Sequence, residues 1–175
     1  VHLGDASPKH IEQAKAINAN AKSKLASVAV LDARDLGHYP DDSIDYILLL
    51  GPLYHLIHEN DRLQALRESF RVLKPGAKIF PAGISRFASA LDGLSRDLLA
   101  DARFQKIMSN DLENGIHRNE TERLDYFTTS KFHRPEELKA EVLQAGFTEV
   151  EVLGIEGPSW ILPDFEKRWQ DPRQR

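Results

Sequence analysis

The sequence predicts an α/β protein with an open, mostly parallel sheet and helices on both of its faces. Amphipathic helical patterns alternate with short apolar segments along the chain, which is typical of this class. The segment from Ile44 to Leu50 is almost continuously apolar, as expected of a parallel strand that is covered on both faces. The 175 residues include no cysteine, so disulfides and thiolate zinc sites cannot build the core.

The first elements follow from caps and apolar spacing. Residues 1–3 read as the end of a strand, and Pro8 suits the first position of a helix that runs to about Leu25. Its expected buried stripe recurs at intervals of three and four residues and comprises Ile11, Ala14, Ile17, Ala21 and Leu25. Residues 28–31 and 44–50 are predicted to be the next strands, with a turn at residues 40–43 between them.

The middle of the chain continues the alternation. A helix capped by Asn60 or Asp61 is predicted next, and it should stop at residues 74–76, which read Lys-Pro-Gly. Its apolar positions recur at intervals of three and four residues and comprise Leu63, Leu66, Phe70 and Leu73. Residues 77–82 then form a strand. Residues 84–130 lose strand character and carry short, charged helical patterns, which predicts an insert or lid.

A last helix is predicted to begin at Pro135 and to be capped by Gly146. Residues 147–155 are expected to return as a strand, and residues 156–175 form a polar tail. His133, just before this helix, is expected to cap it or to be exposed.

Composition excludes several classes of function. With 27 acidic and 23 basic residues the net charge is −4, so we expect no nucleic-acid partner. The longest apolar run, residues 47–50, is too short to span a bilayer, so we expect no membrane association. These features favour a cytoplasmic protein that acts on a small molecule.

Acidic residues follow two of the predicted strands, at the edge where ligands bind in open α/β sheets. Asp5 at a strand end suits the two hydroxyls of a ribose, although an aspartate there also caps helices. Asp32 can accept a hydrogen bond from an adenine amino group while the Ala33 N–H donates to the ring. The simpler alternative for Asp32 is an Asx turn that ends the strand.

The order and spacing of these motifs narrow the interpretation. Residues 5–8 read Asp-Ala-Ser-Pro and residues 32–36 read Asp-Ala-Arg-Asp-Leu; residues 40–45 read Pro-Asp-Asp-Ser-Ile-Asp. Residues 50–56 read Leu-Gly-Pro-Leu-Tyr-His-Leu, and residues 71–76 read Arg-Val-Leu-Lys-Pro-Gly. Together they closely resemble class I S-adenosylmethionine-dependent methyltransferases of the UbiE-like, type 11 kind over most of residues 1–155.

The resemblance implies a Rossmann-like fold, S-adenosylmethionine as cofactor and methyl transfer to a small-molecule acceptor. It assigns Asp5 to the cofactor ribose and Asp32, with the Ala33 N–H, to the adenine. Leu50 and Gly51 would approach the methionine part and the methyl group. The catalytic candidates Tyr54 and His55 would face the donor or the acceptor, with His55 as the candidate base if the acceptor needs one.

The sequence departs from the family at its glycine-rich loop, which should precede Asp5 by roughly 20 residues. No GxGxG occurs, and the chain begins four residues before Asp5. We therefore expect residues 1–175 to be a single partial methyltransferase domain that lacks the first strand and the last one. Residues 84–130 would be a helical insert or lid over the acceptor site.

The acceptor pocket is expected to draw on residues after the fifth strand of the family. Arg86 could pair with an acceptor carboxylate or phosphate, and Phe87, Tyr126 and Trp160 could line an apolar acceptor site. Core packing and surface solvation are the simpler uses of these side chains. No metal site is predicted.

Two other functions are compatible with parts of the pattern. The chain could be a non-catalytic fragment or a cofactor-binding module without the donor loop. An NAD(P)-dependent oxidoreductase would share the ribose-binding acid. Two observations argue against it: the sequence contains the pairs Asp32-Ala33 and Gly51-Pro52, and it has no Tyr-x-x-x-Lys motif.

Overall fold

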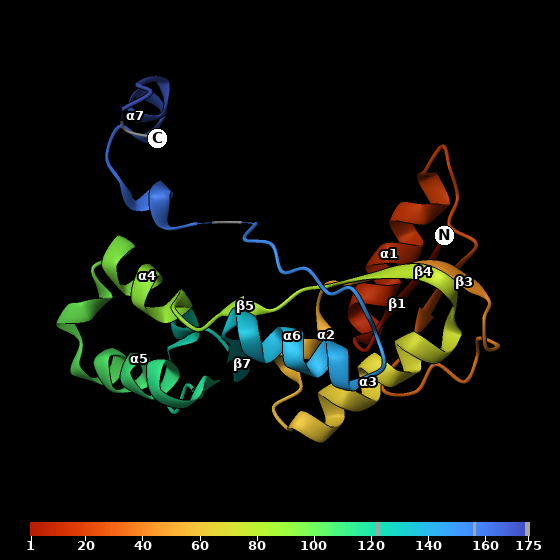
Figure 1. Ribbon diagram of the computed structural model, residues 1–175. Helices are drawn as coiled ribbons and strands as arrows, with labels where there is room; N and C mark the ends of the chain where they lie inside the picture. The colour runs from red at the N-terminus through yellow and green to blue at the C-terminus, as the bar shows by residue number, and fades with distance from the viewer. Residues whose placement is uncertain (122, 156, 174–175) are drawn as a thin grey trace. The chain divides into compact units, whose positions relative to one another are not determined.

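The computed structural model describes residues 1–121, 123–155 and 157–173, without the side chain of residue 160 (Figure 1). The chain forms two compact units. Unit 1 consists of Val1–Ala82 and Glu141–Thr148, and unit 2 consists of Gly83–Ala140 and Glu149–Arg175. Helices alternate with short, mostly parallel sheets, so the predicted α/β class is confirmed.

The chain order of unit 1 follows the predicted alternation. Its elements are β1 (His2–Asp5), α1 (Pro8–Asn20), β2 (Ser27–Val30), β3 (Ile44–Leu49), α2 (Pro52–His55), α3 (Glu59–Val72) and β4 (Leu73–Pro81). The last residues of α6 (Pro135–Gln144) also belong to unit 1.

Strands β1 and β2 form a parallel pair, with His2 opposite Ser27 and Asp5 opposite Val30. The Leu31 N–H donates to the Asp5 carbonyl and extends the ladder by one bond of 3.1 Å. Helix α1 connects the two strands and lies against both of them (Figure 1). The carboxyl ends of β1 and β2 therefore meet at one edge.

Strands β3 and β4 form a second parallel pair, with Leu49 opposite Pro81. The Ala82 N–H donates to the Leu49 carbonyl at 2.9 Å, just before the chain turns at Gly51. In the described residues no ladder joins this pair to β1 and β2, so the predicted sheet is present as separate parallel pairs.

The core of unit 1 is built around α3. Its residues Leu63, Ala65, Leu66 and Val72 are buried, as are Ile11, Leu49 and Leu53 in the same unit. The cap of helix α3 is His58, two residues before Asn60 and three before Asp61, and the helix ends at Val72, so that Leu73 and the Lys-Pro-Gly segment already belong to β4. Phe70, one of the predicted apolar positions, is 48% exposed.

Two predictions for unit 1 are wrong. Helix α1 ends at Asn20 and does not run to Leu25. Ala21 is extended, and the Asn18 side chain accepts from the Leu25 N–H at 2.8 Å, which closes a loop. Ile17, expected in the buried stripe, is 72% exposed.

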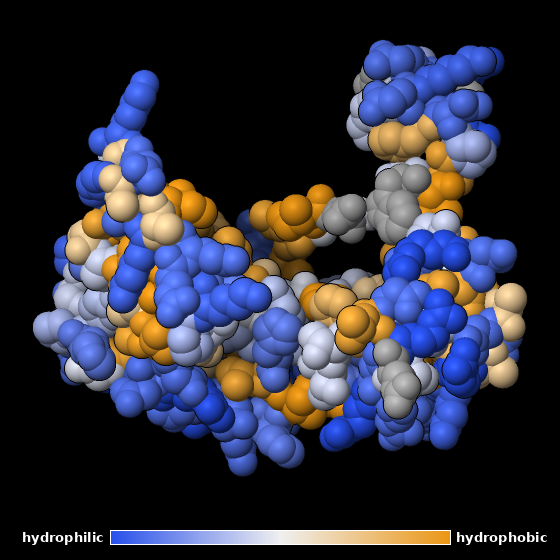
Figure 2. Space-filling view, turned by 180° about the vertical axis from the view of Figure 1, so that it is seen from behind, coloured by the Kyte–Doolittle hydropathy of each residue, from blue (hydrophilic) through white to orange (hydrophobic). Residues whose placement is uncertain are grey.

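Strand β3 is not covered on both faces. Tyr46 and Leu48 are exposed, as is Phe80, the β4 partner of Leu48, so one apolar face of this pair reaches the surface. Apolar surface is visible among polar surface in Figure 2.

Unit 2 carries the short helices predicted for residues 84–130. Its elements are β5 (Ile84–Ser85), α4 (Ala88–Ser95), the 3-10 helix η1 (Leu98–Ala100), α5 (Ala102–Asn114), β6 (Ile116–His117), η2 (Leu124–Tyr126), β7 (Ser130–His133), the first part of α6, η3 (Pro158–Ile161) and α7 (Phe165–Gln170).

The strands of unit 2 were not predicted from the sequence. β7 is completely buried and pairs in parallel with β5 and antiparallel with β6. It reads Ser-Lys-Phe-His, and three polar residues in four hide a buried strand from hydropathy. His133, expected to cap a helix or to be exposed, is 3% exposed in β7.

The strand expected over residues 147–155 is absent from the described residues there. Glu149 has a φ of 54°, which interrupts an extended backbone, and residues 151–155 are exposed. A strand needs a paired neighbour to satisfy its backbone, and the structure shows no ladder for these residues. Helix α6 and its cap at Gly146, by contrast, form as predicted.

Candidate functional site

The Asp5 carboxylate lies at the end of β1 and is partly engaged by its own neighbours. Its Oδ1 accepts from the Ser7 N–H at 2.7 Å, and its Oδ2 lies 3.4 Å from the His10 ring. Ser7 in turn caps α1, with Pro8 in the first helical turn as predicted. The side chain of Asp5 is 42% exposed, so lone pairs on Oδ2 remain open to a ligand.

Asp32 follows β2 and is held by Arg34. Its Oδ1 accepts from the Arg34 N–H at 2.9 Å, and its Oδ2 accepts from Nη2 at 2.7 Å. Arg34 also reaches Asp61 on α3 at 3.1 Å. The hydrogen bond from the Arg34 side chain is the main reason that the pKa of Asp32 lies below its usual value.

The hydrogen bonds from Arg34 to Asp32 form a local turn that occurs at other places in the chain. Asp101 and Arg103 form the same set of contacts, with 2.8 Å from the backbone N–H and 2.7 Å from Nη2. Asp171 and Arg173 repeat it. Asp-x-Arg spacing is therefore the signal from which the role of Arg34 could have been predicted. Its position after β2, beside the end of β1, distinguishes Asp32 from the other two acids.

The loop after β3 continues directly into the single turn α2. Leu53 is fully buried, and the Tyr54 hydroxyl donates to the Leu50 carbonyl at 3.0 Å. The His55 ring lies 4.7 Å from the Tyr54 ring and is exposed. Both predicted catalytic side chains thus stand on one short turn at the carboxyl end of β3.

These positions fit an adenosine-containing cofactor in chemistry. Two carboxylates with exposed oxygens, Asp5 and Asp32, lie at the shared end of a parallel pair. At Gly51, a Cβ would meet only the Tyr54 hydroxyl, at 3.9 Å, so the backbone of this loop is open to close approach.

Arg86, expected to bind an acceptor, is buried in unit 2 and bonded to protein on all sides. Its Nη2 donates to both oxygens of Glu137 at 2.7 Å, and its Nε donates to the Phe132 carbonyl at 3.1 Å. Its Nη1 reaches the Glu113 carbonyl at 3.3 Å. The guanidinium therefore ties β7, α5 and α6 residues of unit 2 together.

Tyr126 is also committed to the interior of unit 2. Its ring is 1% exposed and its hydroxyl donates to Asp101 Oδ2 at 2.7 Å. Burial, followed by that hydrogen bond, raises the pKa of Tyr126 above its usual value. The same carboxylate, bonded first by Arg103 and then by Tyr126, has its pKa lowered.

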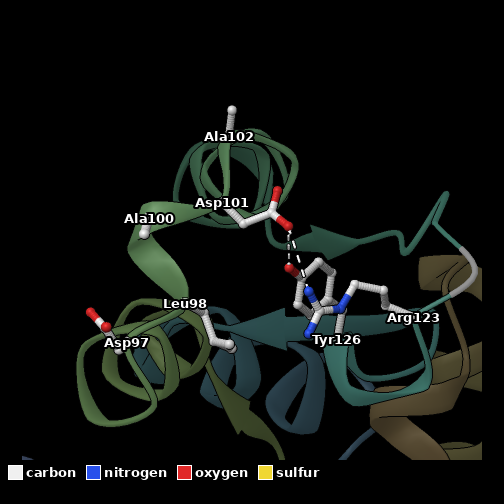
Figure 3. A pocket seen from close by; sticks show the side chains of 7 residues that line it. All are labelled: Asp97, Leu98, Ala100, Asp101, Ala102, Arg123 and Tyr126. Atoms are coloured by element: carbon white, nitrogen blue, oxygen red, sulfur yellow. Dashed lines mark hydrogen bonds and ion pairs between the residues drawn. The ribbon is translucent and has the colours of Figure 1, made fainter.

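An open hollow of about 520 Å³ adjoins this pair (Figure 3). Arg123 lies over the Tyr126 ring, with its guanidinium carbon 4.6 Å from the ring centre, and one of its amino groups points to Asp101 (Figure 3). Asp97 points away from this cluster (Figure 3). The polar groups of the hollow mostly satisfy one another.

Of the two remaining acceptor candidates, the structure describes the side chain of Phe87 alone. Phe87 precedes α4 and is 54% exposed. The side chain of Trp160 lies outside the described residues. Among the described residues, no group of three metal-ligating side chains occurs, and no helix is long and apolar enough to cross a membrane.

Comparison with known proteins agrees with the sequence motifs. Residues 1–80 match the model of a family described as "Methyltransferase domain". These residues contain all three strand ends described above. A search of curated protein sequences finds no significant match.

Solved structures resemble the chain in fold. A SAM-dependent methyltransferase from Methanosarcina mazei is 19% identical, with a TM-score of 0.61 over 83% of this chain and 68% of that chain. A SAM-dependent methyltransferase from Thermotoga maritima, titled a possible histamine N-methyltransferase, is 19% identical, with a TM-score of 0.52 over 83% of this chain and 54% of that chain. This chain thus spans about two thirds of the first structure and about half of the second.

The family model and the similar solved structures both indicate a methyltransferase. The cofactor that they imply is S-adenosylmethionine. Residues 1–80 thus match a methyltransferase domain in sequence, and the chain resembles S-adenosylmethionine-dependent methyltransferases in fold.

Proposed function

We propose that this protein transfers a methyl group from S-adenosylmethionine to a small-molecule acceptor, and that unit 1 holds the adenosine end of the cofactor. One observation carries the assignment of the site: Asp5 and Asp32 stand at the shared carboxyl end of the parallel pair β1–β2. Ligands of open α/β sheets bind at this edge.

Each side chain has a distinct task in this proposal. The Asp5 carboxylate accepts the ribose hydroxyls, because Oδ2 keeps open lone pairs while Oδ1 is used by the Ser7 N–H. Asp32, kept ionised by Arg34, accepts from the adenine amino group, and the Ala33 N–H donates to the ring. Leu50 and Gly51 lie against the methionine part.

The cofactor, when bound, supplies an activated methyl group on a positively charged sulfur. The chain then has to align the acceptor with that carbon, which is catalysis by proximity. His55, exposed on α2 next to Tyr54, is the proposed base for an acceptor that must lose a proton. Tyr54, bonded to the Leu50 carbonyl, keeps the turn in place.

The proposed acceptor residues lie in unit 2. Phe87 offers an exposed aromatic surface for an apolar acceptor, and Trp160 is proposed for the same role. Arg86 and Tyr126 contribute by fixing the segments around them, since their polar groups already bond to protein.

Calorimetric titration of the full chain with S-adenosylhomocysteine tests the cofactor site. Asp5→Asn and Asp32→Asn preserve one side-chain oxygen for the local turn and replace the other with a donor, which cannot accept from ribose or adenine. We expect each variant to bind about tenfold or more weakly, since a hydrogen bond to a charged group contributes about 1.5–3 kcal/mol.

Asp45→Asn is the matched control. Asp45 is also an exposed acid, 72% accessible and bonded to Lys74 at 2.7 Å, but it lies near the amino end of β3. Its affinity should equal that of the unmodified chain. Equal binding by all four proteins, or none by the unmodified chain, would reject the proposed site.

A further inference from the structure

Arg62 of α3 has a buried guanidinium in unit 1. Its side chain is 4% exposed, and the carboxylate of Glu141, its partner, is 8% exposed. Nε donates to both oxygens of Glu141 at 3.0 Å, and Nη2 donates to Oε1 at 2.6 Å. A buried charge of this kind is costly unless it is paired and bonded throughout.

The opposite edge of the same guanidinium faces backbone. Nη1 donates to the Leu56 carbonyl at 2.8 Å and to the Ile57 carbonyl at 2.9 Å. These carbonyls belong to the chain immediately after α2, the turn that carries Tyr54 and His55. Arg62 thus bonds the C-terminal end of the turn whose N-terminal end is Gly51.

The turn α2 cannot hold its shape alone. It contains four residues, and isolated helices shorter than roughly 12 residues are marginal in water. The Leu56 N–H closes the turn on the Pro52 carbonyl at 3.0 Å, and Leu53, a residue of the turn, is fully buried. The two bonds from Arg62 fix the carbonyls that follow.

Lysine cannot replace this geometry. A planar guanidinium presents donors on two edges, so it serves a carboxylate and two carbonyls together, whereas an ammonium group is a single point of charge. Glu141 orients the plane of Arg62 and balances its charge. Together they form a rigid support beneath the turn.

We infer that Arg62, oriented by Glu141, is a positioning residue that fixes the turn from Gly51 to His55 in the shape required at the cofactor and acceptor. The expected effect on cofactor binding rests on the proposed function. The support of the turn itself is a property of unit 1 that can be measured without any ligand.

Amide hydrogen exchange of Leu56 in the full chain is the test, because this amide reports directly on closure of the turn. The double variant Arg62→Met with Glu141→Leu removes both charges of the buried pair, so the fold is expected to persist. Its Leu56 amide should exchange at least about tenfold faster than in the unmodified chain. The Leu31 amide, which bonds to Asp5 in the same unit, should stay within about twofold.

A second Arg–Glu pair, with both of its residues on α3, provides the control. Arg71 bonds to Glu68 at 2.8 Å and donates to the Tyr39 carbonyl at 3.1 Å. The double variant Glu68→Leu with Arg71→Met should leave Leu56 exchange unchanged. Should the first double variant fail to fold, Arg62→Lys decides by the same comparison of Leu56 with Leu31.

Two outcomes would overturn the inference: Leu56 exchange within about twofold of the unmodified chain, or equal acceleration at Leu56 and Leu31, which indicates general loosening. A parallel titration with S-adenosylhomocysteine separates the two proposals. If the unmodified chain fails to bind, the proposed function fails, whereas the positioning role still stands or falls on Leu56. If it binds, we expect the Arg62→Met, Glu141→Leu chain to bind about tenfold more weakly.

Discussion

The protonation of His117 follows from the two acceptors on either side of its ring. Nε2 lies 2.7 Å from the Tyr126 carbonyl, which can only accept, so this nitrogen carries a proton. Nδ1 lies 2.7 Å from Asp111 Oδ2, which also accepts from Ser89. With 1% exposure for His117 and none for Asp111, this hydrogen-bonded pair is buried in unit 2.

A pH dependence follows for unit 2. Burial alone would lower the pKa of His117, but the bond and charge of Asp111, with the Tyr126 carbonyl, outweigh it and raise the pKa above 6.5. The folded state therefore holds the proton more tightly than the unfolded state. This stabilisation is complete below about pH 6.5 and is lost as pH rises through the folded pKa, by about 1.4 kcal/mol for each unit between the two pKa values.

Urea unfolding at several pH values, followed through the amide of Phe132, measures this effect, because that amide bonds to Gly115 within unit 2. We expect the free energy of unfolding to fall from pH 6 to pH 9. His117→Gln should remove most of the slope, and His38→Gln, at an exposed position, should keep it. A slope unchanged in His117→Gln would contradict the assignment.

At the scale of elements, the predictions succeeded where a local signal exists. Ser7 and Pro8 marked the start of α1, and Gly146 marked the end of α6. Strand β7 could not be predicted from hydropathy, because three of its four residues are polar although all four are buried. The prediction of a strand over residues 147–155 was wrong, because an apolar pattern does not guarantee a neighbouring strand with which to pair.

The exposed face of β3 yields a stability prediction. Leu48 is 68% exposed and its neighbour Leu49 is 7% exposed, so alternate residues of one strand face surface and core. Leu49→Ala should cost about 2–5 kcal/mol in the free energy of unfolding. Leu48→Ala should cost under about 1 kcal/mol. Equal costs in denaturant titrations would contradict the exposed face.

Two glycines with positive φ offer a second comparison between elements. Gly76 has a φ of 78° and open space around it, whereas at Gly115, with a φ of 71°, a Cβ would clash with the Phe132 carbonyl and the Arg86 guanidinium. Gly76→Ala should cost about 1–2 kcal/mol from backbone strain alone. Gly115→Ala adds the clash and should cost about 3 kcal/mol or more in unit 2. Thermal unfolding monitored through Phe132 checks the second value, and a cost for Gly115→Ala no greater than that for Gly76→Ala would count against the close packing.

At the scale of the whole molecule, the resemblance to methyltransferases and the cofactor that it implies could be predicted from short motifs that follow strands, such as Asp32-Ala33. The supports of these motifs could not. Arg62 meets Glu141 across 79 positions of sequence, and Arg86 meets Glu137 across 51, so only the fold reveals what these charges do. The division into two units likewise depends on contacts between distant segments.

The most direct test of the central claim is a titration of the isotope-labelled full chain with S-adenosylhomocysteine, followed by amide chemical shifts. We predict saturable shifts at Ser7, Ala33 and Gly51, the amides at the carboxyl ends of β1, β2 and β3. Amides in the interior of unit 2, such as Phe132, should not move. Absence of shifts, or shifts confined to unit 2, would contradict the assignment of the cofactor site to unit 1.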